Sequence, residues 1–224
     1  MASVLTVDFE KGETSAPALQ TIRSVLNSAG VIAFPTDTYY GLGADPFNPQ
    51  ALSRIFRIKQ RPMDKPLLVL IHSLEQLATL TSEVSENAGL LMERFWPGPL
   101  TLIFKAAPGV PKELTAGTGT VGVRQPDHPF TQKLLQELQQ PLTAPSANIS
   151  GDKEPVTAQE VANTLGEALD LIVDGGPAPG GKLSTILDTT TDPPTVLREG
   201  AVSFEDMESL LPIQRGGSPG SLKI

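Results

Sequence analysis

The sequence predicts an α/β fold, and three observations lead to that prediction. Short apolar runs alternate with segments that repeat apolar residues at helical spacing, which is typical of a mixed α/β domain. The 20 glycines and 21 prolines separate these segments from one another. Hydrophobic residues make up 39% of the 224 residues and charged residues 19%. This composition supplies a core and is too apolar for a disordered chain.

The first half of the chain contains the longest predicted helices. Residues 16–29 place Leu19, Ile22 and Leu26 on one helical face, and Gly30 ends that helix. Asn48 is a predicted N-cap with Pro49 in the first helical position. The other elements predicted up to residue 138 are strands at 31–34, 67–71, 100–104 and 121–124, and helices at 84–95 and 128–138.

The second half is predicted to contain shorter elements. Thr157 and Glu160 form a capping-box pattern before an apolar helical stripe. Strands are expected at 142–144, 171–173, 185–187 and 195–197, with a helix near 204–211. No long polar linker divides the chain, so residues 1–212 are interpreted as one domain. Residues 213–224 are interpreted as a flexible tail because they are rich in Gly and Ser.

The charge and residue types exclude several classes of function. There are 17 Lys and Arg residues against 25 Asp and Glu residues, a formal net charge of −8 that excludes a generally basic surface. Cysteine is absent, which excludes disulfides, thiolate metal sites and cysteine nucleophiles. His72 and His128 are far apart in the sequence, and we predict no metal site. Neither a leader nor an apolar membrane span is visible, so a cytoplasmic protein without membrane contact is expected.

Two glycine-rich segments resemble nucleotide-binding motifs without their context. Residues 117–122 match GxGxxG, but a strand end and Pro126 follow where a dinucleotide-binding fold needs a helix. Residues 176–182 approach a phosphate-binding loop, but Leu183 stands where that motif requires Ser or Thr. We interpret both segments as loops.

A basic segment at residues 54–65 is the best candidate for an anion site. It contains five Lys or Arg residues and one acid, Asp64. Pro62 disfavours helical backbone at Arg61, and in an extended segment the side chains of Lys59 and Arg61 would point to the same side. Such a pair suits a polyphosphate or a carboxylate. Taken alone, the segment is equally well explained as a solvated basic turn.

Small polar residues follow several predicted strands, where α/β sheets commonly place ligand groups. Thr36 and Thr38 come after the strand at 31–34, and Ser146 and Asn148 come after the strand at 142–144. Each set also has a structural interpretation, as a turn that satisfies its own backbone. Further candidates are Arg124, Ser184 and Arg198.

Together these motifs make the sequence resemble the YrdC/Sua5 family of L-threonylcarbamoyladenylate synthases. The resemblance extends over about residues 12–211, and the motifs occur in the family's order. They are PTDTYYGLG (35–43), KQRP (59–62), KPLL (65–68), WPGPLT (96–101), VGVR (121–124), APSAN (144–148) and STI (184–186). The family fold implied is a twisted mixed sheet with flanking helices and a concave, positively charged cavity. The chain resembles the short, single-domain form of the family.

The resemblance implies that L-threonine, bicarbonate or CO2, and ATP are joined into threonylcarbamoyl-adenylate with release of pyrophosphate, assisted by Mg²⁺ bound with the nucleotide. The product would serve t6A formation in tRNA through downstream transferase machinery, with weak tRNA contact as a further expectation. By resemblance, Lys59 and Arg61 are catalytic and bind ATP together with Ser146, Asn148 and Arg198. Thr36, Arg124 and Ser184 are expected to bind threonine.

Two alternatives remain beside this interpretation. One is the carbamoyl-adenylate-handling domain of hydrogenase-maturation proteins, which are longer and carry zinc-finger segments. The absence of cysteine disfavours it. The other is a non-catalytic module that binds RNA or a nucleotide. The net charge of −8 and the lack of a base-stacking aromatic motif disfavour that alternative.

Overall fold

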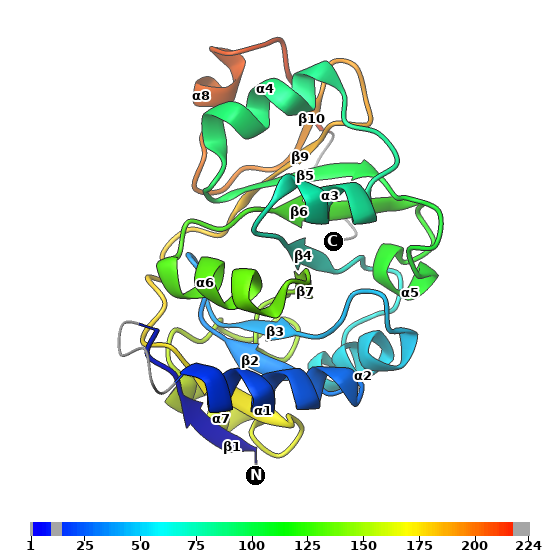
Figure 1. The fold of residues 1–224 in the computed structure, drawn as a ribbon. Coiled ribbons are helices and arrows are strands. Elements are labelled where there is room, and N and C mark those ends of the chain that lie inside the picture. The colour runs from blue at the N-terminus through cyan, green and yellow to red at the C-terminus, as the bar shows by residue number, and fades with distance from the viewer. Residues whose placement is uncertain (1, 10–14, 217–224) are drawn as a thin grey trace.

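Two β-sheets and the helices around them form the fold (Figure 1). The structure is a computed structural model that describes residues 2–9 and 15–216. The smaller sheet has the order β1-β8-β2-β3, with β1, β8 and β2 parallel and β3 antiparallel. Its strands are β1 (Ser3–Thr6), β2 (Ile32–Phe34), β3 (Gly41–Gly43) and β8 (Leu171–Asp174).

The larger sheet has the order β11-β10-β9-β5-β6-β4-β7 and mixes parallel with antiparallel pairs. Its strands are β4 (Leu68–Leu70), β5 (Leu100–Lys105), β6 (Thr120–Arg124), β7 (Leu142–Thr143), β9 (Thr185–Asp188), β10 (Thr195–Arg198) and β11 (Gln214–Arg215). The predicted twisted mixed sheet is therefore confirmed.

Helices surround both sheets (Figure 1). The described residues form α1 (Ser15–Asn27), α2 (Pro49–Lys59), α3 (Leu74–Leu80), α4 (Glu86–Phe95), α5 (Lys112–Thr115), α6 (Pro129–Leu138), α7 (Ala158–Leu165) and α8 (Phe204–Glu208). None of these helices has both the length and the apolar character that crossing a bilayer requires.

Helix α2 leads into the candidate anion segment, and its ends follow from local sequence. The Asn48 side chain accepts hydrogen bonds from the backbone N–H groups of Gln50 and Ala51, which confirms the predicted N-cap. Leu52 and Ile55 are fully buried on one face of the helix. The helix ends at Gln60, which has a left-handed backbone (φ 49°). This turn directs the chain from α2 toward the larger sheet.

The two sheets meet beside the segment 144–148. The Thr143 hydroxyl of β7 accepts a hydrogen bond from the backbone N–H of Ala44 and donates to the carbonyl of Leu42. Gly41 of β3 forms an isolated antiparallel bridge with Ser146. A Cβ on Gly41 would lie only 3.2 Å from the Cβ of Ala144, so this close approach favours glycine. The contacts hold Ser146 between the sheets.

Most predicted elements are confirmed, and the differences lie in short segments. Helix α3 was not predicted, although Ser73 and Gln76 have capping-box spacing and Ser73 caps that helix. Strands β1 and β3 and helix α5 were also not predicted, because they span only three or four residues. Residues 117–119 form a turn with Gly117 and Gly119 at positive φ, so the predicted loop is confirmed there, whereas residues 120–122 already belong to β6.

The described part of the predicted tail, residues 213–216, contains a short strand. Its first residues include β11, which pairs with β10 through Thr195 and Gln214. A strand of only two polar residues, Gln214 and Arg215, gives no periodicity in the sequence, so this pairing depends on the neighbouring sheet. Residues 217–224 of the predicted tail lie outside the described residues. That residues 1–212 act as one domain stays a prediction.

Candidate active site

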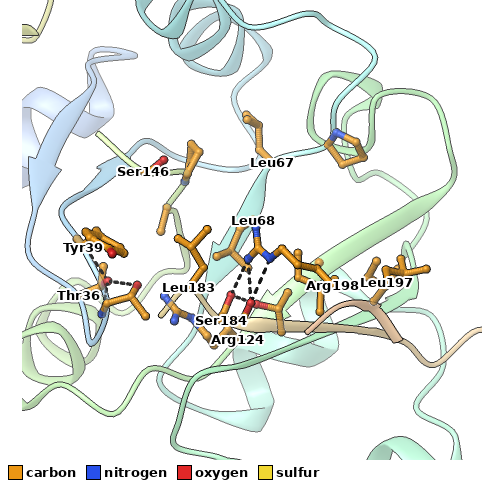
Figure 2. Close-up of a pocket in the computed structure, with 18 of the residues that line it drawn as sticks. Thr36, Tyr39, Leu67, Leu68, Arg124, Ser146, Leu183, Ser184, Leu197 and Arg198 are labelled. Carbon is orange, nitrogen blue, oxygen red and sulfur yellow. Dashed lines mark hydrogen bonds between the residues drawn. The ribbon is translucent and has the colours of Figure 1, made fainter. Parts of the chain in front are cut away.

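A cavity of about 450 Å³ collects the polar residues that follow several strands (Figure 2). One wall comes from the β2–β3 loop and from residues 144–146, and the other comes from the cavity face of β5, β6 and β9. Three arginines line it, Arg61, Arg124 and Arg198, together with the carboxylates Glu154 and Asp188. The cavity is thus lined by more cations than anions in a chain whose net charge is −8.

Two of the cavity arginines, Arg124 and Arg198, lie close enough for their charges to repel. Burial, and then the charge of Arg124, lower the pKa of Arg198, while Glu154 opposes the shift. Burial lowers the pKa of Arg61, with Asp64 opposing the shift. Partly dehydrated cations placed side by side are stabilised by an anionic ligand. The arrangement therefore suits phosphate or carboxylate groups.

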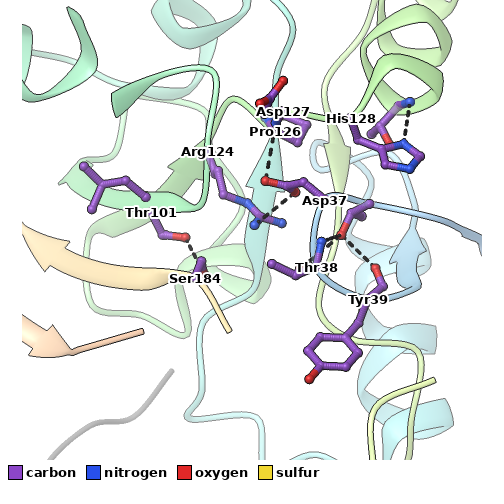
Figure 3. Close-up of polar contacts among 12 residues, drawn as sticks. Asp37, Thr38, Tyr39, Thr101, Arg124, Pro126, Asp127, His128 and Ser184 are labelled. Atoms are coloured by element: carbon purple, nitrogen blue, oxygen red, sulfur yellow. Dashed lines mark hydrogen bonds and ion pairs between the residues drawn. The ribbon is translucent and has the colours of Figure 1, made fainter. Parts of the chain in front are cut away.

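Arg124 lies at the end of β6, where it forms a buried ion pair with Asp37 (Figure 3). The distance from Nη1 of Arg124 to Oδ1 of Asp37 is 3.2 Å. Within the described part of the chain, Nε and Nη1 of Arg124 make no hydrogen bond. Both atoms are buried, so the charge of Asp37 holds this edge of the guanidinium in place of a hydrogen bond.

Ser184 joins Arg198 to the floor of the cavity (Figure 2). Arg198 donates from Nη2 to the Ser184 carbonyl at 2.8 Å and to the Ser184 hydroxyl at 3.3 Å. The Ser184 hydroxyl also lies 3.0 Å from the hydroxyl of Thr101, which comes from β5 (Figure 3). These contacts fix the Ser184 hydroxyl near Arg124 and Arg198.

Thr36 occupies the opposite wall, in the loop after β2. Its hydroxyl donates to the carbonyl of Tyr39 at 2.7 Å and accepts from the backbone N–H of Thr38 at 3.2 Å. The loop therefore satisfies part of its own backbone, as the structural interpretation of this motif expected. Thr36 and Thr38 both still line the cavity, so a ligand in the cavity can reach either side chain.

Ser146 lines the cavity, whereas Asn148 lies behind it. The Ser146 hydroxyl donates to Oδ1 of Asn148 at 2.7 Å, and Nδ2 of Asn148 donates to the carbonyl of Asp152 at 2.6 Å. Asn148 is buried and is not among the residues of the cavity wall. The contacts of Asn148 thus hold Ser146 rather than reach the cavity.

The side chain of Lys59 does not lie where an extended segment would place it. It is the last residue of α2 and is buried, so its side chain does not line the cavity beside that of Arg61. Its Nζ donates to the carbonyls of Ser146 and Asn148 and to Oδ1 of Asn148. Burial and then the charge of Arg61 lower the pKa of Lys59 to about 7, with Glu154 opposing the shift. Helix α2 ends at Lys59, as predicted, and because Lys59 is still helical its side chain is not aligned with that of Arg61 as in an extended segment.

The structure brings six of the eight predicted site residues to one cavity. They are Thr36, Arg61, Arg124, Ser146, Ser184 and Arg198, whereas Lys59 and Asn148 support Ser146 from behind. Sequence reasoning missed Thr101, Glu154 and Asp188. The sequence could have indicated Asp188 as a site residue. It follows Ser184 and Ile186 at two-residue intervals, and such residues share one face of a strand. The described residues contain no group of three His, Cys, Asp or Glu side chains arranged to hold a metal ion.

Comparison with known proteins shows which family the chain belongs to. The Sua5/YciO/YrdC family model, described as "Telomere recombination", matches residues 24–200. The chain belongs to the Sua5/YciO/YrdC family. This match includes all eight predicted site residues, from Thr36 to Arg198, and it confirms the resemblance recognised from the motifs.

Similar members of the Sua5/YciO/YrdC family include two curated threonylcarbamoyl-AMP synthases. The protein from Pyrococcus abyssi is 44% identical over 181 residues, which are 81% of this chain and 53% of that protein. The protein from Bacillus subtilis is 43% identical over 199 residues, which are 88% of this chain and 58% of that protein. The chain therefore spans little more than half the length of these two relatives.

A solved structure from the same family matches the fold. The crystal structure of P. abyssi Sua5 complexed with L-threonine superposes with a TM-score of 0.87 at 38% identity. The match covers 96% of this chain and 63% of that chain. The α/β fold and the family are consequently supported by both sequence and structure.

Proposed function

We propose that this chain is a threonylcarbamoyl-AMP synthase, which condenses L-threonine, bicarbonate or CO2, and ATP and releases pyrophosphate. The observation that carries the proposal is the cavity in which Arg61, Arg124 and Arg198 converge with small hydroxyl side chains. The curated relatives bear the name of this activity, and one Sua5 structure is described as a complex with L-threonine. Bound substrates would neutralise the mutually repelling cations.

The threonine end of the cavity comprises Arg124, Thr36 and Ser184. The guanidinium of Arg124, which belongs to the cavity wall, supplies the positive charge that attracts the threonine carboxylate. The hydroxyls of Thr36 and Ser184, on opposite walls, bind the polar groups of the amino acid. This arrangement leaves the threonine nitrogen directed toward the middle of the cavity, where the carbamate must form.

The ATP end comprises Arg61, Arg198 and Ser146. In the reaction, the threonine ammonium first loses a proton, and the resulting amine takes up the carbon of bicarbonate with release of water, which gives a carbamate. A carbamate oxygen then bonds to the α-phosphorus of ATP while the bond to pyrophosphate breaks. Arg61 and Arg198 stabilise the negative charge on the phosphates, and positioning contributes much of the rate. Lys59 and Asn148 act through Ser146, whose position they fix.

Mg²⁺ enters with the nucleotide in this proposal. Mg²⁺ keeps several waters and binds phosphate oxygens with only one or two protein carboxylates, so it needs no dedicated protein cage. Glu154 lines the cavity and interacts with both Lys59 and Arg198, which makes it the carboxylate suited to that contact. The metal would supply charge neutralisation of the phosphates.

The product is a reactive mixed anhydride that serves t6A formation in tRNA. We expect a separate transferase in the cytoplasm to receive it, with tRNA contact by this chain weak at most because of the net charge of −8. A non-catalytic binding module would bind ATP without consuming it, which separates this alternative from the proposal.

The test is release of pyrophosphate from ATP by the purified chain. We expect release only when L-threonine and bicarbonate are both present, together with a new adenylate detected by mass spectrometry. Equal release without threonine would contradict the proposal. Binding of ATP with no release under any combination of substrates would favour the non-catalytic alternative.

A further inference from the structure

The segment 176–183 connects β8 of the smaller sheet with β9 of the larger sheet and contains no helix or strand. Gly176, Gly180 and Gly181 have φ values of 93°, 71° and 92°. A Cβ on Gly176 or Gly181 would meet nothing within 4 Å, so packed side chains do not fix the backbone there. The segment leads directly into Ser184, and its path therefore sets the position of that side chain in the cavity.

Two neighbouring residues of the β2–β3 loop hold this segment shortly before it enters the cavity. The backbone N–H of Gly180 donates to the carbonyl of Thr38 at 2.7 Å, and the hydroxyl of Tyr39 donates to the carbonyl of Gly181 at 2.5 Å. Within the described part of the chain, Tyr39 provides the only side-chain hydrogen bond to the backbone of residues 177–182. A segment with this much backbone freedom depends on such bonds for its position.

Tyr39 also belongs to the opposite wall of the cavity (Figure 2). Its carbonyl accepts a hydrogen bond from the hydroxyl of Thr36 at 2.7 Å. The hydroxyl of the same residue reaches Gly181, three residues before Ser184. A single side chain thus links Thr36 on one wall to the chain that carries Ser184 on the other wall.

We propose that Tyr39 is a positioning residue for the threonine end of the cavity. Its hydroxyl fastens the segment 176–183 to the β2–β3 loop and thereby holds Ser184 at a fixed spacing from Thr36. Without that hydroxyl the segment regains backbone freedom, which a bound amino acid must then remove at a cost in affinity. The role toward threonine rests on the proposed function, whereas the fastening is a property of the unliganded chain.

The first test measures amide hydrogen exchange in the unliganded chain, with Tyr39→Phe, which keeps the ring and removes only the hydroxyl. The amides of residues 178–183 should exchange about three- to tenfold faster than in wild type, since one neutral hydrogen bond no longer opposes local opening. The control is Thr21→Val, which removes a hydroxyl that donates to the carbonyl of Pro17 on α1, outside the cavity. It should leave exchange in residues 178–183 unchanged. Equal exchange in Tyr39→Phe and wild type would overturn the fastening.

The second test is calorimetric titration of the same proteins with L-threonine. We expect Tyr39→Phe to bind threonine about three- to tenfold more weakly than wild type, because the site is no longer held in its binding geometry. Thr21→Val should bind with wild-type affinity. Wild-type affinity in Tyr39→Phe would contradict the positioning role.

A double-mutant cycle distinguishes positioning from direct contact with the amino acid. If Tyr39 acts through Ser184, removing its hydroxyl should matter little once the Ser184 hydroxyl is gone. The double variant Tyr39→Phe, Ser184→Ala should therefore bind threonine about as tightly as Ser184→Ala alone. Losses that multiply in the double variant would show that the Tyr39 hydroxyl acts independently of Ser184, which contradicts the proposal.

These measurements separate failure of the inference from failure of the proposed function. If wild type binds threonine, the variants respond as expected and no adenylate forms, the role of Tyr39 stands and the proposed activity is lost. If wild type forms the adenylate while Tyr39→Phe shows unchanged exchange and affinity, the role of Tyr39 alone is lost. A wild-type chain that does not bind threonine contradicts both.

Discussion

Nη1 of Arg124 lies 3.2 Å from Oδ1 of Asp37, and the two side chains are only 2% and 6% exposed. The other carboxylate oxygen of Asp37 accepts a hydrogen bond from the backbone N–H of Asp127 at 3.3 Å. Burial lowers the pKa of Arg124, while the charge of Asp37 opposes that shift. Asp37 thus keeps a dehydrated guanidinium charged at the wall of the cavity. It acts as a positioning residue for Arg124.

Asp37→Asn tests this relationship. The substitution keeps the shape and one oxygen acceptor but leaves the Arg124 charge without a counter-charge, and breaking a buried pair costs about 3 kcal/mol. We expect a loss of that order in the free energy of unfolding, measured with urea. Glu167→Gln, which alters an exposed carboxylate, is the control and should change stability by less than about 0.5 kcal/mol. Equal stability of the two variants would show that the pair contributes nothing.

Arg61 and Arg57 provide a matched comparison within one basic segment. Arg61 lines the cavity, where it also donates to the carbonyl of Pro66 at 3.0 Å, whereas Arg57 is exposed on α2. Removing a charged hydrogen bond of about 1.5–3 kcal/mol should make kcat/KM ten- to a hundredfold lower for Arg61→Ala. Arg57→Ala should retain wild-type kcat/KM. Similar losses in both variants would indicate general electrostatic attraction of ATP rather than a specific contact.

Lys59 gives the chain a dependence of stability on pH. Its pKa falls from 10.5 in the unfolded chain to about 7 in the folded protein. Between these values the unfolded chain binds one more proton, so the contribution of Lys59 to stability is largest above pH 10.5 and is lost as the pH falls toward 7. The stability of wild type relative to Lys59→Met should therefore rise by roughly 1–2 kcal/mol from pH 7 to pH 9.

Guanidinium denaturation of both proteins at the two pH values measures this difference. A constant difference would show that the three oxygen acceptors around Nζ hold the ammonium form throughout this range. Because the unchanged groups titrate equally in both proteins, the comparison isolates Lys59.

The sequence predicted structure and site residues correctly where short motifs determine both the local backbone and the groups that can bind a ligand. Local rules predicted the N-cap at Asn48, and the resemblance of the VGVR and STI motifs predicted that Arg124 and Ser184 belong to the site, where both line the cavity. The burial of Lys59 could not be predicted, because its acceptors belong to the segment 146–148, almost ninety residues further along the chain. Glu154 likewise enters the cavity through a loop without periodicity. Contacts distant in sequence decide such positions.

Ser184, at the threonine end of the cavity, is expected to contact the bound amino acid. The Ser184 hydroxyl lies near Arg198 and Thr101, at 3.3 Å and 3.0 Å. If it also binds the substrate, Ser184→Ala should weaken threonine binding by up to about tenfold, the value of one neutral hydrogen bond. Wild type should bind threonine much better than valine, because valine leaves polar partners in the site unpaired. Serine should fall between them, since it keeps the hydroxyl and loses the methyl group.

Calorimetry with the three amino acids on wild type and Ser184→Ala measures these affinities, and Ser82→Ala, at an exposed serine outside the cavity, is the control. The variant should lose more affinity for threonine and serine than for valine, because only the first two carry the hydroxyl that Ser184 recognises. Equal losses for all three would indicate that Ser184 acts on the amino and carboxylate groups that they share rather than on the side-chain hydroxyl. Wild-type affinity for threonine in Ser184→Ala would make Ser184 a structural residue and move the contact to Thr38 and Arg124, which line the same cavity.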